Sequence, residues 1–248
     1  MLSGYYTIAS GMLTRQRELD VIGNNLVNVS TPGYRTDRML ISSFEQELTR
    51  QEVNYTQGLS NTSATSAVAD EVVSLFHDGT IKSTNRSLDV AISGDGFFNI
   101  QSDNGTLLTR NGQFEIDQQG YLTLPAIGRV LGANGPIQVR NENFTVDADG
   151  SVYNDQGNFL GAIQVTVPAE GAELLKLDNG LFQLANGAGG QAAQNYTVNQ
   201  NNLELSNVDM NQEMTNLIEA QRAFQACSSA LQIVDSMNRK AATQLASL

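Results

Sequence analysis

A helical pattern gives way to an extended chain within one stretch, Asp20-Val-Ile-Gly-Asn-Asn-Leu-Val-Asn-Val-Ser-Thr-Pro-Gly-Tyr-Arg35. Pro32 lacks an amide hydrogen and disfavours helical geometry in the residue before it, and Gly33 permits a tight turn. We therefore expect a first helix from residue 3 to about residue 29, ending at this turn.

Apolar side chains upstream of the turn recur at intervals of three and four, which keeps them on one side of a helix. The positions are Tyr5, Ile8, Met12, Arg15, Leu19, Ile22, Leu26 and Val29. The same spacing returns near the C-terminus, at Met210, Glu213, Leu217, Ala220, Phe224, Cys227, Leu231, Val234, Asn238, Ala241 and Leu245. These two seams predict terminal helices that pair with each other and with neighbouring subunits.

Both seams contain a charged residue, which must reach solvent or an acidic or basic partner. We hypothesise that Arg15 of the first helix pairs with Glu213 of the second. Ser206 or Asn207 is expected to cap the second helix, because short polar side chains accept hydrogen bonds from a helix's first amides.

The middle of the chain is built from turns and short strands. Of the 22 glycines, 17 lie between Gly79 and Gly190. Asn-Gly and Asp-Gly dipeptides favour the positive φ of hairpin turns, and they alternate here with apolar stretches. The expected strands contain Leu88/Val90/Ile92, Phe114/Ile116, Ile137/Val139, Phe144/Val146 and Ile163/Val165/Val167. The predicted class is α+β, mainly an antiparallel, glycine-rich β domain bracketed by coiled-coil-like terminal helices.

The domain boundaries follow from these patterns. Residues 1–33 and 206–248 should pair as a helical core, and residues 76–190 should form the β domain. Residues 34–75 and 191–205 are expected to connect them. In the first connector, the spacing of Met39, Leu40, Phe44 and Leu48 allows another helical turn or two, and Gln57–Asp70 is typical of an extended or flexible segment.

Composition excludes several functions. The net charge of the 248 residues is −12, and no basic cluster stands out, so we expect no nucleic-acid binding. Without an apolar run of about 18 residues, we expect no membrane insertion. The N-terminus lacks a basic segment followed by an apolar core, so we expect no cleaved secretory signal.

The sequence gives only weak evidence for catalytic or metal-binding residues. Acidic residues alternate around Gly150 between Asp147 and Asp155, but the glycine stands at position four rather than position six of a calcium loop. Gly94-Asp95-Gly96 is typical of a tight turn or bulge, His77 of a surface position, and Cys227 of a buried packing thiol. We predict no catalytic residue, metal or cofactor, although a hydrolase using Asp95 or Asp147 stays open.

Four segments together resemble the axial proteins of the bacterial flagellum, the rod and hook family. The Asp20–Arg35 stretch is similar to the family's N-terminal signature, with Gly23 and Val27 where alanine is usual. The other three are Leu88-Asp-Val-Ala-Ile-Ser-Gly-Asp-Gly-Phe-Phe98, Leu108-Thr-Arg-Asn-Gly-Gln-Phe-Glu-Ile-Asp117 followed by Gly120, and Ser206-Asn-Val-Asp through Leu217-Ile-Glu-Ala-Gln-Arg-Ala-Phe224. In its length and in the modest size of its β domain, the chain resembles the rod subunits, proximal or distal, more than the longer hook protein. The short segment after Gly128 favours the proximal type of rod subunit.

The resemblance implies a non-enzymatic subunit of the basal-body rod that transmits torque. Its terminal helices would pack with those of other rod and hook subunits, and with further copies, into a tube. Export would use the flagellar type III apparatus, without a cleaved signal, to a rod that spans the periplasm. The alternative, from another class, is a free-standing oligomeric binding module or adhesin whose helices form a stalk.

The seams and the signature motifs together predict the residues that matter most. The expected assembly interface comprises Ile8, Met12, Leu19, Ile22, Leu26, Asn24, Asn25, Asn28, Leu217, Phe224, Leu231 and Val234. The expected structural turns are at Pro32, Gly33, Gly94, Gly96 and Gly112.

Overall fold

The computed structural model describes residues 2–43, 67–102, 105–169, 172, 174–185 and 190–246. The chain divides into two compact units. The helical unit consists of Met1–Val27, Asp37–Leu75 and Asp209–Leu248, and the β unit consists of Asn28–Thr36 and Phe76–Val208.

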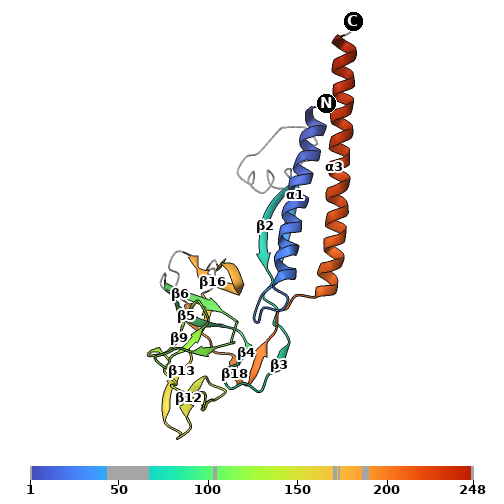
Figure 1. Cartoon of the computed structure of the whole chain (residues 1–248). Helices are drawn as coiled ribbons and strands as arrows, with labels where there is room; N and C mark the ends of the chain where they lie inside the picture. The colour runs from blue at the N-terminus through green and yellow to red at the C-terminus, as the bar shows by residue number, and fades with distance from the viewer. Residues whose placement is uncertain are drawn as a thin grey trace. The chain divides into compact units, whose positions relative to one another are not determined.

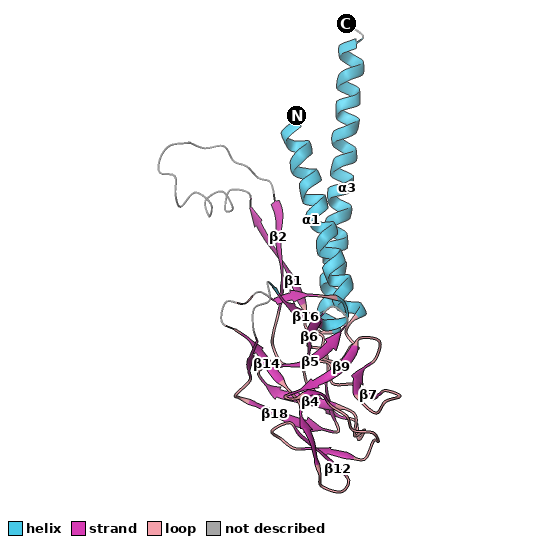
Figure 2. Cartoon of the chain, turned by 90° about the vertical axis from the view of Figure 1, so that its left-hand side faces the viewer, coloured by secondary structure: helices cyan, strands magenta, loops and turns pink. Residues whose placement is uncertain are grey.

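Two helices and a two-stranded sheet make up the described part of the helical unit. Helix α1 (Leu2–Val27) packs along helix α3 (Met210–Ala246), and the two run in opposite directions (Figure 1). Strands β1 (Asp37–Ser43) and β2 (Ala67–Ser74) pair antiparallel and contact α1 (Figure 2). The terminal segments are therefore partners within a single chain.

The helical turns allowed near Met39 and Leu40 are wrong, because both residues lie in β1. An isolated helix of one or two turns is marginal in water. The backbone of β1 instead pairs with β2 from Asp37 opposite Ser74 to Ser43 opposite Ala67. Phe44, Leu48 and the greater part of Gln57–Asp70 lie outside the described residues.

Ten of the described strands form the main sheet of the β unit, in the order β15-β16-β6-β5-β9-β8-β7, with β10 beside β9 and β14 beside β5 and β17. All of the pairs are antiparallel. The bounds are β5 (Phe97–Ser102), β6 (Gly105–Thr109), β7 (Glu115–Ile116), β8 (Leu122–Leu124), β9 (Gly128–Gly132), β10 (Gly135–Pro136), β14 (Val165–Pro168), β15 (Leu174–Lys176), β16 (Leu181–Leu184) and β17 (Gly190–Ala192).

Smaller antiparallel sheets complete the described part of the β unit. One has the order β11-β12-β13, and β18 pairs with β4 and β19 with β3. A short 3-10 helix, η2 (Asp178–Gly180), precedes β16. The bounds are β3 (Ile81–Ser83), β4 (Val90–Gly94), β11 (Phe144–Val146), β12 (Ser151–Asn154), β13 (Phe159–Ala162), β18 (Tyr196–Gln200) and β19 (Asn202–Glu204).

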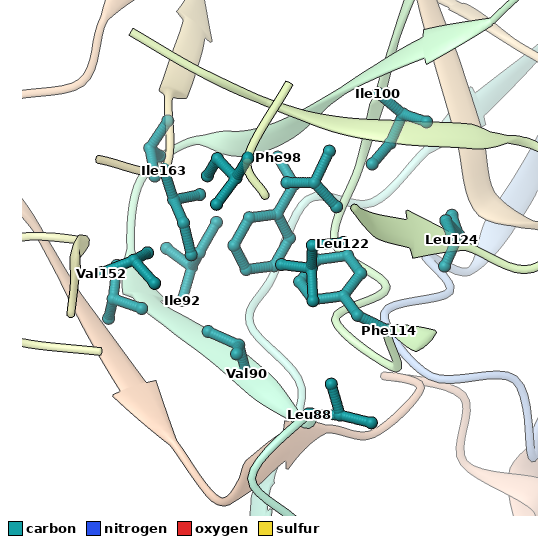
Figure 3. Close-up of a cluster of buried hydrophobic side chains, with 14 of the residues drawn as sticks. Leu88, Val90, Ile92, Phe98, Ile100, Phe114, Leu122, Leu124, Val152 and Ile163 are labelled. Carbon is teal, nitrogen blue, oxygen red and sulfur yellow. The ribbon is translucent and has the colours of Figure 1, made fainter. Parts of the chain in front are cut away.

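The hydrophobic core lies inside the β unit, and Figure 3 shows its centre. Successive side chains of a strand point to opposite faces. Phe98 accordingly joins this core and meets Phe114 edge-on at 5.2 Å, whereas Phe97 packs with Phe182 in a second cluster. The predicted antiparallel β domain between terminal helices is therefore confirmed as the fold class.

One expected strand is absent. Ile137 and Val139 are buried in the core as expected, but no regular strand contains them. Local bonding explains this, because the amide of Ile137 donates to the carbonyl of Val130, and the amide of Val139 to that of Gly120. Among the described residues, no helix has the length and apolar character needed to cross a membrane.

Candidate assembly interface

Two contacts fix the register of α1 against α3. A Cβ added at Gly11 would lie 4.0 Å from the Sγ of Cys227, and Asn25 Nδ2 donates to Glu213 Oε2 at 3.3 Å. In both pairs the residue numbers add to 238, as expected for antiparallel helices. Each residue of α1 therefore faces the position of α3 whose number completes that sum.

Burial follows the predicted seam on α3. Ala220 is buried and Glu213, Leu217, Phe224, Cys227, Leu231, Val234 and Asn238 are half-buried. Met210 departs from the pattern, with 47% of its surface exposed. On α1, Ile22 is buried and Ile8, Met12, Leu19 and Leu26 are half-buried. The structure thus brings the sequence-predicted seam residues together within one chain.

The three asparagines of the N-terminal motif differ in burial and in the hydrogen bonds that they make. Asn25 is buried and joins α1 to the start of β1, because it donates to the carbonyl of Asp37 at 2.8 Å and accepts from the same residue's amide at 2.9 Å. Asn28 accepts from the hydroxyl of Thr31 at 3.1 Å where the helix has ended. Asn24 is exposed on α1.

The hypothesised Arg15–Glu213 ion pair is wrong. Arg15 pairs with Glu18 one turn away at 2.6 Å, and Glu213 accepts from Asn25. The register explains this, since the position opposite Arg15 is residue 223, about 15 Å along the helix from Glu213 at about 1.5 Å per residue.

The expected N-cap of α3 is also wrong. Asp209 caps the helix, because its Oδ1 accepts from the amides of Asn211 at 2.9 Å and Gln212 at 3.3 Å. Asn207 instead accepts from the amide and the hydroxyl of Thr36, both at 2.7 Å, and so bridges the two segments of the β unit.

The register gives a direct test of the helix pair. Gly11→Cys should form an intrachain disulfide with Cys227 under mild oxidation, because the added Cβ lies close to the existing sulfur. A non-reducing gel and a thiol titration of dilute monomer would measure it. Gly23→Cys is the matched control, because a Cβ at Gly23 meets no atom within 4 Å. Equal oxidation of the two variants would contradict the register.

Large apolar side chains outside the seam face solvent on both helices. On α1 they are Tyr6, Leu13 and Val27, and on α3 they are Met214, Ile218, Ile233 and Met237. Two predicted seam residues, Tyr5 and Met210, are also exposed, at 41% and 47%. Single exposed apolar residues are ordinary, but contiguous apolar faces on long helices mark contact sites. The folded chain therefore leaves apolar helix faces for partners.

A group of charges, buried except for Asp78, holds together the two segments of the β unit that border α1 and α3. We name Arg35, Asp78, Arg110 and Glu204 the junction cluster. Glu204 accepts from Arg35 at 2.8 Å and from Arg110 at 3.3 Å, and Arg35 and Glu204 are each 1% exposed. Arg35 also reaches Asp78 at 3.2 Å. The cluster therefore links the segment after α1, the end of β6 and the segment before α3.

Main-chain groups complete the cluster. Gly79 N donates to Glu204 Oε1 at 2.9 Å, and Arg110 donates to the carbonyl of Gly94 at 2.6 Å. Burial lowers the pKa of Arg110, with a further lowering from nearby Arg35, while Glu204 and Asp78 act in the opposite direction. Sequence reasoning missed this site, although Arg35 and Arg110 both lie in quoted motifs.

The predicted turn residues lie at close approaches of the backbone. Gly33 follows Pro32 with a φ of 67°, and a Cβ there would lie 2.3 Å from the carbonyl carbon of Arg110. A Cβ at Gly112 would lie 1.6 Å from the carbonyl oxygen of Val90, so a side chain has no room there. Gly94, the last residue of β4, and Gly96, just before β5, both have positive φ.

The residues weighed as catalytic or metal-binding candidates make contacts that stabilise turns and segments of the fold. The carboxylate of Asp149 accepts hydrogen bonds from the backbone amide of Ser151 at 2.9 Å and from the hydroxyl of Ser151 at 3.0 Å. The hydrogen bond from the backbone amide is the main cause of the lowered pKa of Asp149. His77 is exposed and its carbonyl accepts from Asn207. Among the described residues, no group of three His, Cys, Asp or Glu side chains could hold a metal ion.

Paired terminal helices with exposed apolar side chains, together with an antiparallel β unit in the same chain, define an assembly-forming structural subunit. Residues 6–35 match the family "Flagella basal body rod protein", residues 91–152 "Flagellar hook protein FlgE/F/G D1 domain", and residues 199–245 "Flagellar basal body rod FlgEFG protein C-terminal". The chain belongs to the family of flagellar basal-body rod proteins.

Curated relatives match over almost their whole length. The flagellar basal-body rod protein FlgG of Bacillus subtilis is 32% identical over 95% of this chain and 96% of the relative. FlgF of Escherichia coli is 30% identical over 98% of each. FlgF of Caulobacter vibrioides is 29% identical over 99% of this chain and 98% of the relative. The resemblance seen in four motifs thus extends through the chain.

Proposed function

We propose that this chain is a structural subunit of the flagellar basal-body rod, and that its terminal helices assemble with other rod and hook subunits into a tube that transmits torque. The observation that supports this most is the pair of long terminal helices, whose seams pack against each other and are mostly half-buried within the chain, while apolar side chains outside them face solvent. The proposed partners, other rod and hook subunits, follow from membership of the family of flagellar basal-body rod proteins.

The same proposal covers location and partners. The subunit acts in the basal body, as part of a rod that spans the periplasm, after passage through the flagellar export apparatus without a cleaved signal. It binds copies of itself and neighbouring axial proteins, with no nucleic acid, membrane insertion, cofactor or catalysis. Its assembly interface includes the predicted residues of both terminal helices, and the helices that lie within residues 1–33 and 206–248 form its helical core.

The adhesin alternative gains no support from the relatives, which are rod proteins over nearly the full chain. The two functions differ in solution behaviour. A stalked adhesin would form a fixed oligomer of defined size, whereas a rod subunit would polymerise with rising concentration.

Deletion of the chromosomal gene tests the proposal. We expect truncated basal bodies, no filament and no motility, seen by electron microscopy of isolated basal bodies and on soft agar. A version lacking Val208–Leu248 should fail to restore motility and should not polymerise when purified, because α3 is then absent. Complete basal bodies in the deletion strain would contradict the proposed function.

A further inference from the structure

The seam alone does not select the register of α1 against α3. Seam positions recur every seven residues on both helices, as at Tyr5, Met12, Leu19 and Leu26 on α1 and at Leu217, Phe224 and Leu231 on α3. If α1 slid by seven residues, about 10 Å at about 1.5 Å per residue, seam residues would again lie opposite seam residues. Another feature must therefore select one register.

Helix α3 is long enough to offer a second complete register. It has 37 residues and α1 has 26, and Figures 1 and 2 both show α3 continuing past the N-terminal end of α1. In the observed register Leu2 faces position 236 and Val27 faces position 211. After a slide of seven residues they would face positions 243 and 218, and all of α1 would still lie along α3. The length of the overlap therefore favours neither register.

In the helical unit, Asn25 bonds α3 and the start of β1 at the same time. Its Nδ2 donates to Glu213 Oε2 at 3.3 Å and to the carbonyl of Asp37 at 2.8 Å, and its Oδ1 accepts from the amide of Asp37 at 2.9 Å. The side chain is 1% exposed, so losing a partner would leave buried polar groups unpaired. After the slide, Asn25 would face Ala220, whose side chain offers no hydrogen bond.

In the β unit, Asn207 joins the segments that lead into the helical unit. Its Oδ1 accepts from the amide and the hydroxyl of Thr36, both at 2.7 Å, and its Nδ2 donates to the carbonyl of His77 at 3.0 Å. Thr36 directly precedes Asp37, and Asn207 stands two residues before Asp209, the N-cap of α3. Asn207 therefore restrains the chain just before β1 and just before α3.

We propose that Asn25 and Asn207, which we name the register pair, select the observed alignment of α1 and α3 from the two that the seam allows. Asn25 bonds Asp37, whose chain neighbour Thr36 bonds Asn207. The chain then runs from Asn207 into the first turn of α3, where Glu213 accepts from Asn25. Hydrogen bonds and main chain thus form one closed ring, and a slide of seven residues opens it.

A buried polar position is an established means of fixing register between helices whose apolar repeat fits several alignments. The register pair works in the same way, but half of it lies in the β unit. The inference concerns how one chain aligns its own helices, so it goes beyond the proposed function.

Two introduced cysteines report the register through Cys227. Gly11→Cys lies opposite Cys227 in the observed register, whereas Glu18→Cys would lie opposite it after the slide. In the observed register residue 18 is seven positions, about 10 Å, from the position opposite Cys227, which is beyond the reach of a disulfide. We expect Gly11→Cys to oxidise at least about tenfold faster than Glu18→Cys, measured on non-reducing gels of dilute full-length monomer.

Removal of the register pair should change the ratio of these two rates. Asn25→Ala with Asn207→Ala should lower it by at least about tenfold, the shift expected when one or two ordinary hydrogen bonds no longer favour one register. Each single variant should lower it by less. Asn207→Asp keeps the oxygen that accepts from Thr36 and should retain most of the ratio. A general loosening of the helices would slow both oxidations and leave their ratio unchanged.

Asn211→Ala is the matched control on α3. Asn211 is exposed, and its bonds to Asp209 and Thr215 are made by its main-chain amide and carbonyl, which the substitution keeps. It should leave the ratio of rates at the parent value. Hydrogen-exchange protection of Phe98 and Ile100 should persist in every variant, because both belong to the core of the β unit.

Three outcomes overturn the inference: an unchanged ratio without the register pair, loss of both cross-links together, or equal oxidation of Gly11→Cys and Glu18→Cys when the pair is intact. Loss of both cross-links would mean that the two asparagines hold the helices together without selecting their register. Each result comes from a single chain in solution, so it is independent of the basal bodies of the deletion strain.

Discussion

Glu204→Gln is expected to lower the free energy of unfolding of the β unit by about 3–5 kcal/mol, the usual cost of removing one partner from a buried ion pair. The substitution keeps the size of the side chain and an oxygen for the amide of Gly79. It removes the only fully buried carboxylate that the described residues place between Arg35 and Arg110. Two buried guanidinium groups would then repel each other.

Urea unfolding followed by hydrogen exchange of the β5 amides would measure this change. Asp78→Asn makes the same chemical change in the same cluster, but Asp78 is 59% exposed. We expect a loss of at most about 1 kcal/mol there, because exposed ion pairs contribute little. Equal losses for the two variants would show that burial of Glu204 is not what makes it important.

Phe224→Asp or Leu217→Asp should separate α3 from α1 and abolish assembly, while the β unit stays folded. Both side chains are half-buried on the seam, and an unpaired charge buried there costs several kcal/mol. Neither residue belongs to the β unit, whose core is formed by its own strands. Soft-agar motility and sedimentation would report assembly, and exchange protection of Phe98 and Ile100 would report the β unit.

Gln221→Asp is the matched control on the same helix, since Gln221 is exposed. It introduces the same charge without placing it on the seam, so motility should persist. Unchanged motility in Leu217→Asp or Phe224→Asp would show that this face is not buried in the assembled rod. Loss of β-unit protection in either variant would show that the two units fold together.

Periodicity predicted the elements of this protein well because each follows from local spacing. The alternation of three and four between Leu217 and Val234 is enough to place those residues on one side of a helix. Helix α1 follows from the same spacing, and its end from the turn at Pro32-Gly33. Glycine content and turn dipeptides likewise predicted an antiparallel β domain between the helices.

Partners across the fold were not predictable from the same patterns. Arg15 and Glu213 both occupy seam positions, but the axial register of two helices depends on how side chains such as Asn25 and Cys227 fit the opposite helix. Met39 and Leu40 fit a helical spacing, but they form a strand because β2, about 30 residues later, supplies its hydrogen-bond partners. The spacing of residues along the chain gives no information about which distant segments will come into contact.

The sequence by itself determined two amphipathic terminal helices, a turn-rich β domain and membership of an axial protein family, because these depend on short-range order of residue types. Only the tertiary structure decided that Asn207 bonds Thr36 instead of capping α3, and that Arg35 forms a buried ion pair with Glu204. It also showed that the seam is covered within the chain and that α3 projects beyond α1. Burial and register belong to pairs of distant segments, and neither exists until the chain folds.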